Sequence, residues 1–273
     1  MLLTNGQINN LGEVEQMSDY INIEKTESVL KIGFNRPDKK NALNGEMYYA
    51  VRDALISGAD DASVRAVMIY GTAGNFTTGN DLKEFLDFAT SDKKDFPAKE
   101  FLDVLIPYRK PVIAAVDGLA VGIGATMTIH CDLVYASEEA RFQMPFVNLG
   151  LNPEAGSSFA LPQLIGYHNA AEIILLGGMV TANRAYDMGF VNAVVKQSEL
   201  MDTAMDAAQR IAELPPTPIR LAKSMMKKHF THKTMETNDK EFHSFVNRLS
   251  SPETAEAVQA FMEKRKPDFS RFE

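Results

Sequence analysis

The sequence predicts an α/β fold followed by a helical C-terminal region. Three apolar runs with the length of buried strands, at residues 66–70, 111–116 and 132–136, alternate with loops and helical patterns. Such alternation is typical of a largely buried sheet that helices cover. After about residue 195 strand patterns nearly vanish and amphipathic helical patterns dominate, which predicts a boundary near residue 200.

The first part of the chain predicts an extension, a hairpin and a helix, in that order. Residues 1–18 are polar and aperiodic, so we expect a loosely held extension. Two β-like runs at residues 20–23 and 29–34 predict the strands of a hairpin. A helical pattern with one apolar face then covers residues 46–58, and Asn44 precedes it as an N-cap.

The last part of the chain predicts amphipathic helices up to the basic cluster at residues 264–266. Pro267 follows this cluster and is expected to end the last helix. We therefore divide the chain into an extension, an α/β core and a helical module, at residues 1–18, 19–200 and 201–273.

Composition excludes several classes of function. The 273 residues carry 28 Lys and Arg against 36 Asp and Glu, a formal net charge of −8, which disfavours nucleic-acid binding. One cysteine, Cys131, permits neither an intrachain disulfide nor a cysteine-rich zinc site. No apolar run reaches the ~18–20 residues of a membrane span, and no signal peptide is evident. We expect a cytoplasmic protein with no metal, membrane or nucleic-acid partner.

Two glycine-containing turns precede predicted helix starts, at residues 78–81 and 122–124. Free N–H groups at such starts can bind negative charge, and two of them together can clamp one oxygen. Two ordinary turns would have the same spacing. A dinucleotide fingerprint is excluded because it requires Gly or Ala where this chain has Met127.

Four segments resemble the crotonase superfamily, which is the enoyl-CoA hydratase/isomerase family. In the family's order they are RPDKKNAL, FTTGNDLKEF, KPVIAAVDGLAVGIGATM and FMEKRKPDF, which begin at residues 36, 76, 110 and 261. The resemblance implies a spiral of ββα units with a C-terminal helical trimerisation region. It also implies a homotrimer or hexamer that acts on an acyl-CoA in fatty-acid metabolism, with no cofactor because CoA is part of the substrate.

The resemblance also assigns a binding site. In this family two backbone N–H groups form an oxyanion hole for the thioester oxygen, and the matching residues here are Asn80 and Ile123. The residues that the resemblance places at the CoA-binding site are Lys40, Ala42, Thr78, Gly79, Asp81, Leu82, Phe261 and Lys264.

The two catalytic acids of the family's hydratases are missing. The matching positions hold Thr126 and Phe146, of which the second follows Pro145. Hydration needs one group to activate water and another to deliver a proton to C2, and neither of these side chains exchanges protons at neutral pH. Conventional hydratase activity is therefore not expected.

A different acid is present at Glu154, in the segment LGLNPEAGSS. This segment resembles that of the peroxisomal-type Δ3-Δ2-enoyl-CoA isomerases, whose single catalytic Glu it contains. One carboxylate suffices for isomerisation, because it takes a proton from C2 and returns it at C4 without adding water. Glu154 could instead simply cap the following helix, since acids favour first turns.

Two other functions stay open: another crotonase-type reaction of an acyl-CoA, and a non-catalytic subunit that binds acyl-CoA. His130 is not a candidate base on the sequence, because it lies in an apolar helical segment where a hydrogen-bonded core histidine is expected.

Overall fold

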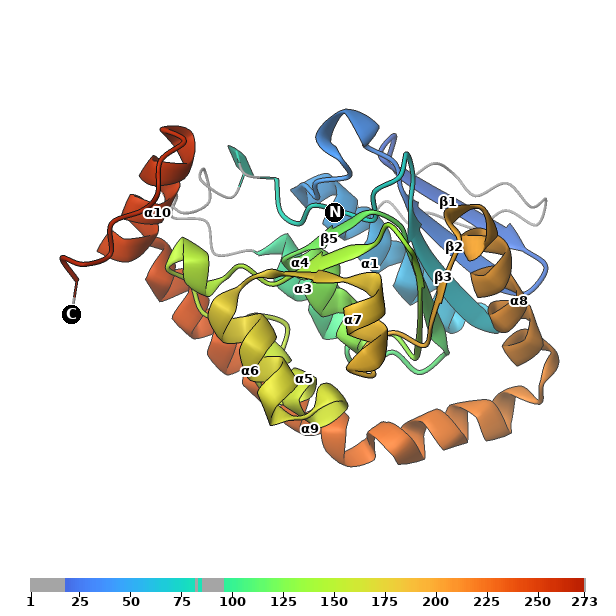
Figure 1. Cartoon of the computed structure of the whole chain (residues 1–273). Helices are drawn as coiled ribbons and strands as arrows, with labels where there is room; N and C mark the ends of the chain where they lie inside the picture. Colours follow the sequence, from blue (N-terminus) through green and yellow to red (C-terminus); the bar gives the residue numbers. More distant parts are fainter. Residues whose placement is uncertain (1–17, 82, 85–95, 273) are drawn as a thin grey trace, which may run out of the picture.

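The computed structural model describes residues 18–81, 83–84 and 96–272, which contain two sheets (Figure 1). The larger sheet has the strand order β1-β2-β3-β4-β6-β9; β1 is antiparallel to β2 and the other neighbours are parallel. Its strands are β1 (Ile21–Thr26), β2 (Val29–Phe34), β3 (Ala66–Gly71), β4 (Val112–Val116), β6 (Leu133–Ser137) and β9 (Ala193–Val195).

The smaller sheet has the order β5-β7-β8, with β5 (Leu119–Val121), β7 (Arg141–Gln143) and β8 (Met179–Thr181). The helices are α1 (Gly45–Asp60), α3 (Pro97–Leu105), α4 (Ile123–Thr126), α5 (Ser157–Ile165), α6 (Tyr167–Leu176), α7 (Ala182–Asp187), α8 (Leu200–Glu213), α9 (Pro216–Leu249) and α10 (Pro252–Met262). Successive turns of the chain give one strand to each sheet and then a helix, as in β4-β5-α4 and β6-β7-α5. This arrangement confirms the α/β spiral of ββα units.

The alternation of side chains along β3 explains how the larger sheet is covered on both faces. Val67 and Ile69 join the main core between the sheet and helices such as α1 and α3. Ala66 and Met68 point to the other face, where they pack with Ala204 and other residues of α8. Both faces of the strand are therefore buried, which is why its sequence is continuously apolar.

Several predicted elements are confirmed. The hairpin turns between Thr26 and Val29, and the side chain of Asn44 caps α1 by accepting a hydrogen bond from the Met47 N–H at 3.0 Å. The predicted end of the last helix is wrong, because α10 ends at Met262, before Pro267. Lys264 then adopts a left-handed conformation with φ of 54°, and the chain turns back along α10.

The sequence patterns did not reveal β5, β7 and β8. Each has three residues, and a strand so short shows too few alternations to be recognised from periodicity.

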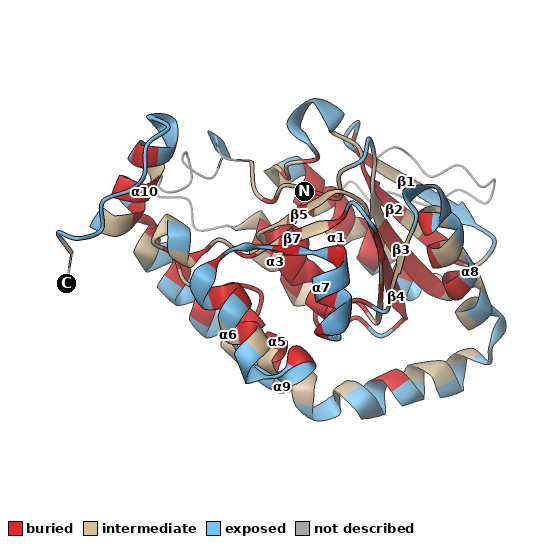
Figure 2. Cartoon of the chain, in the orientation of Figure 1, coloured by how far each residue is buried: buried red, intermediate tan, exposed pale blue. Residues whose placement is uncertain are grey.

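The segment after residue 200 has two different parts. α8 begins at Leu200 and packs its small apolar residues on the larger sheet. The first half of α9 is mostly exposed but is joined to the fold by the ion pair of Lys223 with Asp132, whereas its second half runs beside α5 (Figure 2). None of the helices within the described ranges combines the length and the apolar run that crossing a bilayer requires.

Candidate active site

Glu154 lies in a loop whose backbone is held in an unusual conformation. The two residues that follow it, Ala155 and Gly156, have φ of 61° and 67°, a left-handed region that a residue with a Cβ rarely adopts. His130 stabilises this conformation, because its Nε2 lies 2.8 Å from the carbonyl oxygen of Ala155. The ring is buried and donates from Nε2, as expected for a core histidine, and burial together with the charge of Lys227 lowers the pKa of His130 to about 3.

Glu241 on α9 fixes the same loop from the other side. Its Oε2 accepts a hydrogen bond from the Gly156 N–H at 2.6 Å, and its Oε1 accepts one from the Ser158 N–H at 2.8 Å. Glu241 therefore caps the start of α5. The alternative in which Glu154 caps this helix is wrong, because in the described chain the Glu154 carboxylate accepts no hydrogen bond from the helix N-terminus.

The carboxyl group of Glu154 is buried with few polar partners. Glu154 is 7% exposed. Within the described residues its carboxylate accepts one hydrogen bond, from the Thr126 hydroxyl at 3.3 Å. Burial raises the pKa of Glu154 to about 8, the charge of Glu241 adds to this, and the Thr126 hydrogen bond opposes it. Thr126, at the position of one hydratase acid, thus lies beside the acid that this chain does have.

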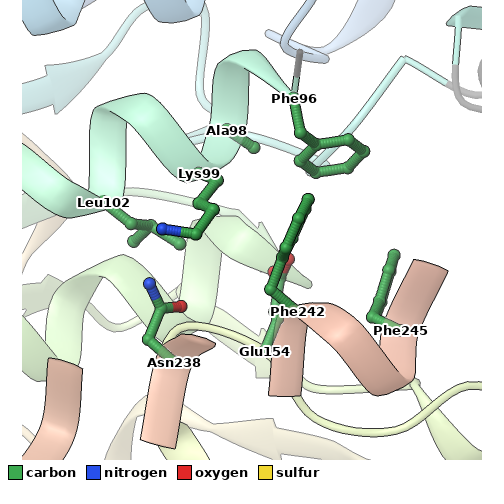
Figure 3. A pocket seen from close by; sticks show the side chains of 8 residues that line it. All are labelled: Phe96, Ala98, Lys99, Leu102, Glu154, Asn238, Phe242 and Phe245. Carbon is green, nitrogen blue, oxygen red and sulfur yellow. The ribbon is translucent and has the colours of Figure 1, made fainter. Parts of the chain in front are cut away.

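Glu154 lines a small pocket whose cavity volume is about 10 Å³, room for about one water molecule (Figure 3). α3 and the residue before it form one wall, and the second half of α9 forms the other. The other lining residues are Phe96, Ala98, Lys99, Leu102, Asn238, Phe242 and Phe245. Most of this lining is apolar, so the pocket provides little hydrogen bonding to water.

The two glycine-containing turns lie against each other. A Cβ built on Gly79 would lie 2.7 Å from the Val121 carbonyl oxygen, and one built on Gly124 would lie 2.8 Å from the Thr77 carbonyl oxygen. Gly79 also has φ of 86°, which favours glycine.

Asn80 and Ile123, the residues that the family resemblance assigns to the oxyanion hole, belong to these two turns. The N–H groups of Asn80 and Ile123 donate to no acceptor in the part of the chain that the structure describes. Ile123 is the first residue of α4, where an N–H without an intrahelical partner is expected. The arrangement offers two N–H donors on adjoining turns.

Tyr48 is a site residue that the sequence patterns did not indicate. Its hydroxyl donates a hydrogen bond of 2.5 Å to Oδ1 of Asn80 and so fixes the side chain of one turn. Burial raises the pKa of Tyr48, with further contributions from the charges of Glu154 and Glu84, so the phenol stays protonated and donates. Nothing in the local pattern of α1 distinguishes Tyr48 from an ordinary core residue.

Four residues predicted to bind CoA lie together on two neighbouring loops. The Lys40 carbonyl oxygen accepts a hydrogen bond from the Thr78 N–H at 3.2 Å. Arg36 donates to the Ala42 carbonyl oxygen at 3.1 Å and to Oδ2 of Asp81 at 2.8 Å. Asp81 thus has a structural role, while the Lys40 side chain is exposed.

Of the other predicted CoA contacts, Gly79 lies in the same turn as Thr78, and Leu82 lies outside the described residues.

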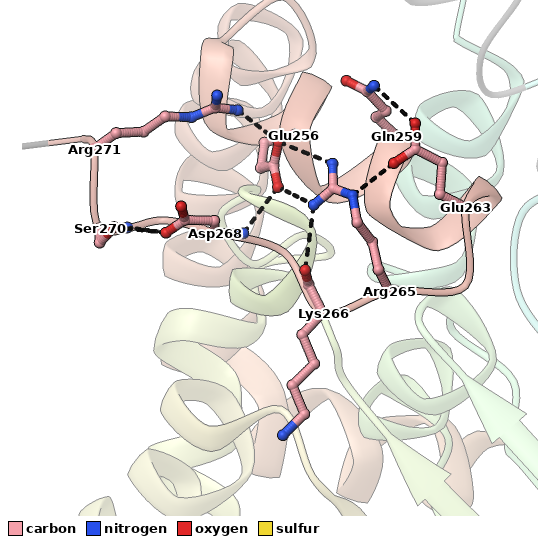
Figure 4. Close-up of polar contacts among 8 residues, drawn as sticks. All are labelled: Glu256, Gln259, Glu263, Arg265, Lys266, Asp268, Ser270 and Arg271. Atoms are coloured by element: carbon pink, nitrogen blue, oxygen red, sulfur yellow. Dashed lines mark hydrogen bonds and ion pairs between the residues drawn. The ribbon is translucent and has the colours of Figure 1, made fainter.

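Phe261 lies on α10 and Lys264 follows it directly, beyond the far end of α9 (Figure 1). Both residues are exposed. The segment after α10 is held by Glu256, whose carboxylate pairs with Arg265 and Arg271 (Figure 4).

The second half of α9 supplies functional residues that the sequence patterns missed. Asn238, Glu241 and Phe242 all reach the pocket or the Glu154 loop. A polar residue followed three positions later by an acid is a common exposed pattern on a helix, so nothing in the local pattern indicated that these side chains are buried. Among the described residues, no group of three or more His, Cys, Asp or Glu could hold a metal ion.

Comparison with known proteins identifies relatives over almost the whole chain. A family model described as enoyl-CoA hydratase/isomerase matches residues 24–271. The chain is 34% identical over 257 residues to enoyl-CoA delta isomerase 2 of Rattus norvegicus; the match covers 92% of this chain but 65% of the rat protein. It is 33% identical to a probable enoyl-CoA hydratase of Mycobacterium tuberculosis, over 91% of this chain and 96% of that protein.

Solved structures agree with these matches. The crystal structure of an enoyl-CoA hydratase/isomerase from Pseudoalteromonas atlantica superimposes with a TM-score of 0.88 and 35% identity. The match covers 92% of this chain and 100% of the other.

Proposed function

The chain belongs to the enoyl-CoA hydratase/isomerase family, and we propose that it is an acyl-CoA isomerase that moves a double bond from Δ3 to Δ2 of an enoyl-CoA. The observation that carries this proposal is the acid content of the pocket. Glu154 is the one carboxylate among the described residues that line it, and by the family resemblance Thr126 and Phe146 stand at the positions of the two hydratase acids. A single acid fits a reaction that moves one proton and adds no water.

In the proposed mechanism Glu154 is the base. Its ionised carboxylate takes the proton from C2 of the 3-enoyl thioester. The C2–H electrons form a C1=C2 bond as the C1=O electrons move onto the thioester oxygen, which gives a dienolate. The N–H groups of Asn80 and Ile123 stabilise the negative charge on this oxygen. The same carboxyl group then delivers the proton to C4: the C3=C4 electrons bond the proton, the C1=C2 electrons form the C2=C3 bond, and the C1=O bond forms again. The high pKa of Glu154 makes its ionised form a strong base.

Three neighbours support this base. His130 and Glu241 hold the loop, and Thr126 is positioned to donate to the carboxylate. Tyr48 fixes the side chain of Asn80 and so orients the turn that carries one N–H donor. These contacts keep the acid and the donors in place without exposing them to water.

The proposed enzyme is a homotrimer or hexamer. The first half of α9 exposes large apolar side chains, including Leu221 at 52%, Met225 at 66% and Met226 at 77%. α8, by contrast, buries its small apolar residues on the sheet of the same chain. Assembly would cover α9 and would let Phe261 and Lys264 approach the CoA of a neighbouring copy. Light scattering that finds a monomer at micromolar concentration would refute this assembly.

The experiment that tests the proposed activity runs two assays on one purified sample. Isomerisation of a 3-enoyl-CoA is followed beside hydration of a 2-enoyl-CoA, and we expect isomerisation with negligible hydration. Hydration at a comparable rate would support the reaction named for the hydratase relatives and would require a second acid. Binding of acyl-CoA without turnover of either substrate would support a non-catalytic subunit.

A further inference from the structure

Asn238 places in the pocket a buried amide nitrogen that has no hydrogen-bond partner among the described residues. The residue is 3% exposed and lines the pocket together with Glu154. No hydrogen bond joins its side chain to any residue that the structure describes, and its Nδ2 is fully buried. Figure 3 shows the amide directed toward Lys99 and Leu102 on the opposite wall.

The other buried polar side chains on α9 have partners. Glu241 accepts two backbone N–H groups, Thr234 donates to the Phe230 carbonyl oxygen, and Lys223 pairs with Asp132 at 2.6 Å. A buried amide that lacks a partner is costly, and proteins rarely retain one without a use. Because Asn238 faces the pocket, the partner it lacks is a group that enters the pocket.

We propose that Asn238 determines substrate specificity by donating a hydrogen bond to a neutral oxygen, a hydroxyl or keto group, carried by the enoyl chain beyond C4. This inference rests on the proposed function, which places C2 and C4 at Glu154. The rest of the chain then extends along the apolar walls past Asn238. A plain hydrocarbon chain would bury the amide unpaired, and a site built for a polar group discriminates against a substrate that lacks it.

Charges at the pocket favour a neutral oxygen over a terminal carboxylate. Among the described residues of the lining Lys99 is the cation, and it already pairs with Asp103 at 2.7 Å and Asp239 at 2.9 Å. Glu154 adds a further acid. A carboxylate on the chain would therefore meet more negative than positive groups, whereas a hydroxyl or keto oxygen needs only the amide donor.

The test measures kcat/KM for 3-octenoyl-CoA and for the same thioester with a hydroxyl on C6, C7 or C8. We expect at least one hydroxylated substrate to exceed the plain one by tenfold or more in the wild-type protein. Asn238→Leu should abolish this preference and raise kcat/KM for the plain substrate. The corresponding ω-carboxyl substrate should be poorer than the hydroxylated one.

Asn247→Leu is the matched control, because it makes the same change at an exposed position of the same helix. Asn238→Ala provides a second variant if Asn238→Leu does not fold, as judged by circular dichroism. A wild-type protein that prefers the plain chain over every hydroxylated one, or an Asn238→Leu protein that keeps the preference, would overturn the inference.

A binding measurement separates this inference from the proposed activity. If no 3-enoyl-CoA is isomerised, the proposed function fails, but calorimetry with octanoyl-CoA and its hydroxylated counterparts still tests Asn238. Tighter binding of one hydroxylated thioester, lost in Asn238→Leu, would support the inference independently. Equal affinities in both proteins would contradict it.

Discussion

Two buried glutamates in this chain have opposite surroundings. Glu154 is 7% exposed and has one hydroxyl donor and a second acid nearby, and its pKa rises to about 8, mainly because of burial. Glu256 is 4% exposed in the C-terminal segment, where hydrogen bonds from Arg265 and from the Asp268 N–H lower its pKa to about 2. Partners rather than burial alone thus decide which carboxyl group can gain and lose a proton near neutral pH.

The contrast separates a structural acid from the acid that we propose as the catalytic base. Glu256 joins Arg265 and Arg271 and ties the last residues of the chain to α10 (Figure 4). Glu154 lacks any cation partner among the described residues and faces an apolar pocket. An acid held in this way is ready to exchange a proton with a bound substrate, whereas an acid neutralised by two guanidinium groups is not.

The largest expected difference between the two acids is in catalysis. Glu154→Gln should reduce isomerisation by about 10²–10⁴-fold or more while leaving acyl-CoA affinity nearly unchanged, because the amide fills the same space but takes no proton. Glu256→Gln should affect KM more than kcat, since it weakens the ion pairs with Arg265 and Arg271 beside Lys264, a residue predicted to bind CoA. Near wild-type turnover by Glu154→Gln would show that both glutamates are structural.

A second test concerns the two turns whose N–H groups are proposed to stabilise the negative charge on the thioester oxygen. Gly79→Val and Gly124→Val should each lower kcat, because a Cβ would meet a backbone carbonyl oxygen of the other turn at 2.7 and 2.8 Å, respectively. Loss of one oxyanion donor costs roughly 2.7–4 kcal/mol in comparable sites. Steady-state kinetics on folded variants would measure this effect, and unchanged kcat would remove the turns from the mechanism.

Asn80→Ala is the matched comparison, because the proposed donor at this residue is its backbone. We expect a smaller loss of kcat than in Gly79→Val, together with a loss of stability of about 1–3 kcal/mol, since the buried Tyr48 hydroxyl loses its acceptor. Tyr48→Phe in the Asn80→Ala background should recover part of that stability. Equal losses of kcat in Asn80→Ala and Gly79→Val would assign the function to the side chain instead.

The stabilities of Glu154→Gln and Glu256→Gln, each relative to wild type, should respond to pH in opposite directions. The folded pKa of Glu154 is above its ordinary value, so its contribution to stability is present at acidic pH and is lost as pH rises through about 8. Glu154→Gln should therefore gain up to about 4 kcal/mol relative to wild type between pH 5 and pH 9. Urea unfolding at both pH values measures this gain, and a constant difference would contradict the raised pKa.

Glu256 has a lowered pKa, so it stabilises the fold above its ordinary pKa and loses this contribution as pH falls toward 2. Glu256→Gln should therefore be less stable than wild type at neutral pH, and the gap should close in acid. A stability difference between Glu256→Gln and wild type that grows in acid would contradict the lowered pKa of Glu256.

The smallest expected effect is on the pH dependence of activity in Glu241→Gln. This change removes a negative charge near Glu154, so the pKa seen in kcat/KM should fall, although burial keeps it above its ordinary value. kcat should also fall because one hydrogen bond to the loop is lost. Glu236→Gln, an acid paired with Lys233 and Lys240 on the same helix, is the control and should not move the pKa.

The sequence predicted those parts of the molecule that depend on local chemistry. Buried strands such as β3 and β4 are long enough to show continuous apolar runs, and Asn44 is a recognisable cap. Glu154 was indicated by its segment, through the family resemblance. The three-residue strands of the smaller sheet were not predicted, because they are defined by pairing rather than by pattern.

The partners of Glu154 could not be predicted for a related reason. Glu241 and Asn238 lie on a long helix and reach the loop only through the path of α9 across the fold. Tyr48 resembles any aromatic residue on the buried face of α1. Their functions depend on contacts between distant segments, and the local sequence carries no information about such contacts.

The most direct test of a single buried acid as the base is the pH profile of kcat/KM for the wild-type protein with a 3-enoyl-CoA. The profile reports the ionisation of the free enzyme. We predict that log kcat/KM rises with unit slope through neutral pH and levels off above about pH 8, where Glu154 is ionised. A profile that is flat from pH 6 to pH 9, or that levels off near the ordinary pKa of a glutamate, would contradict this account.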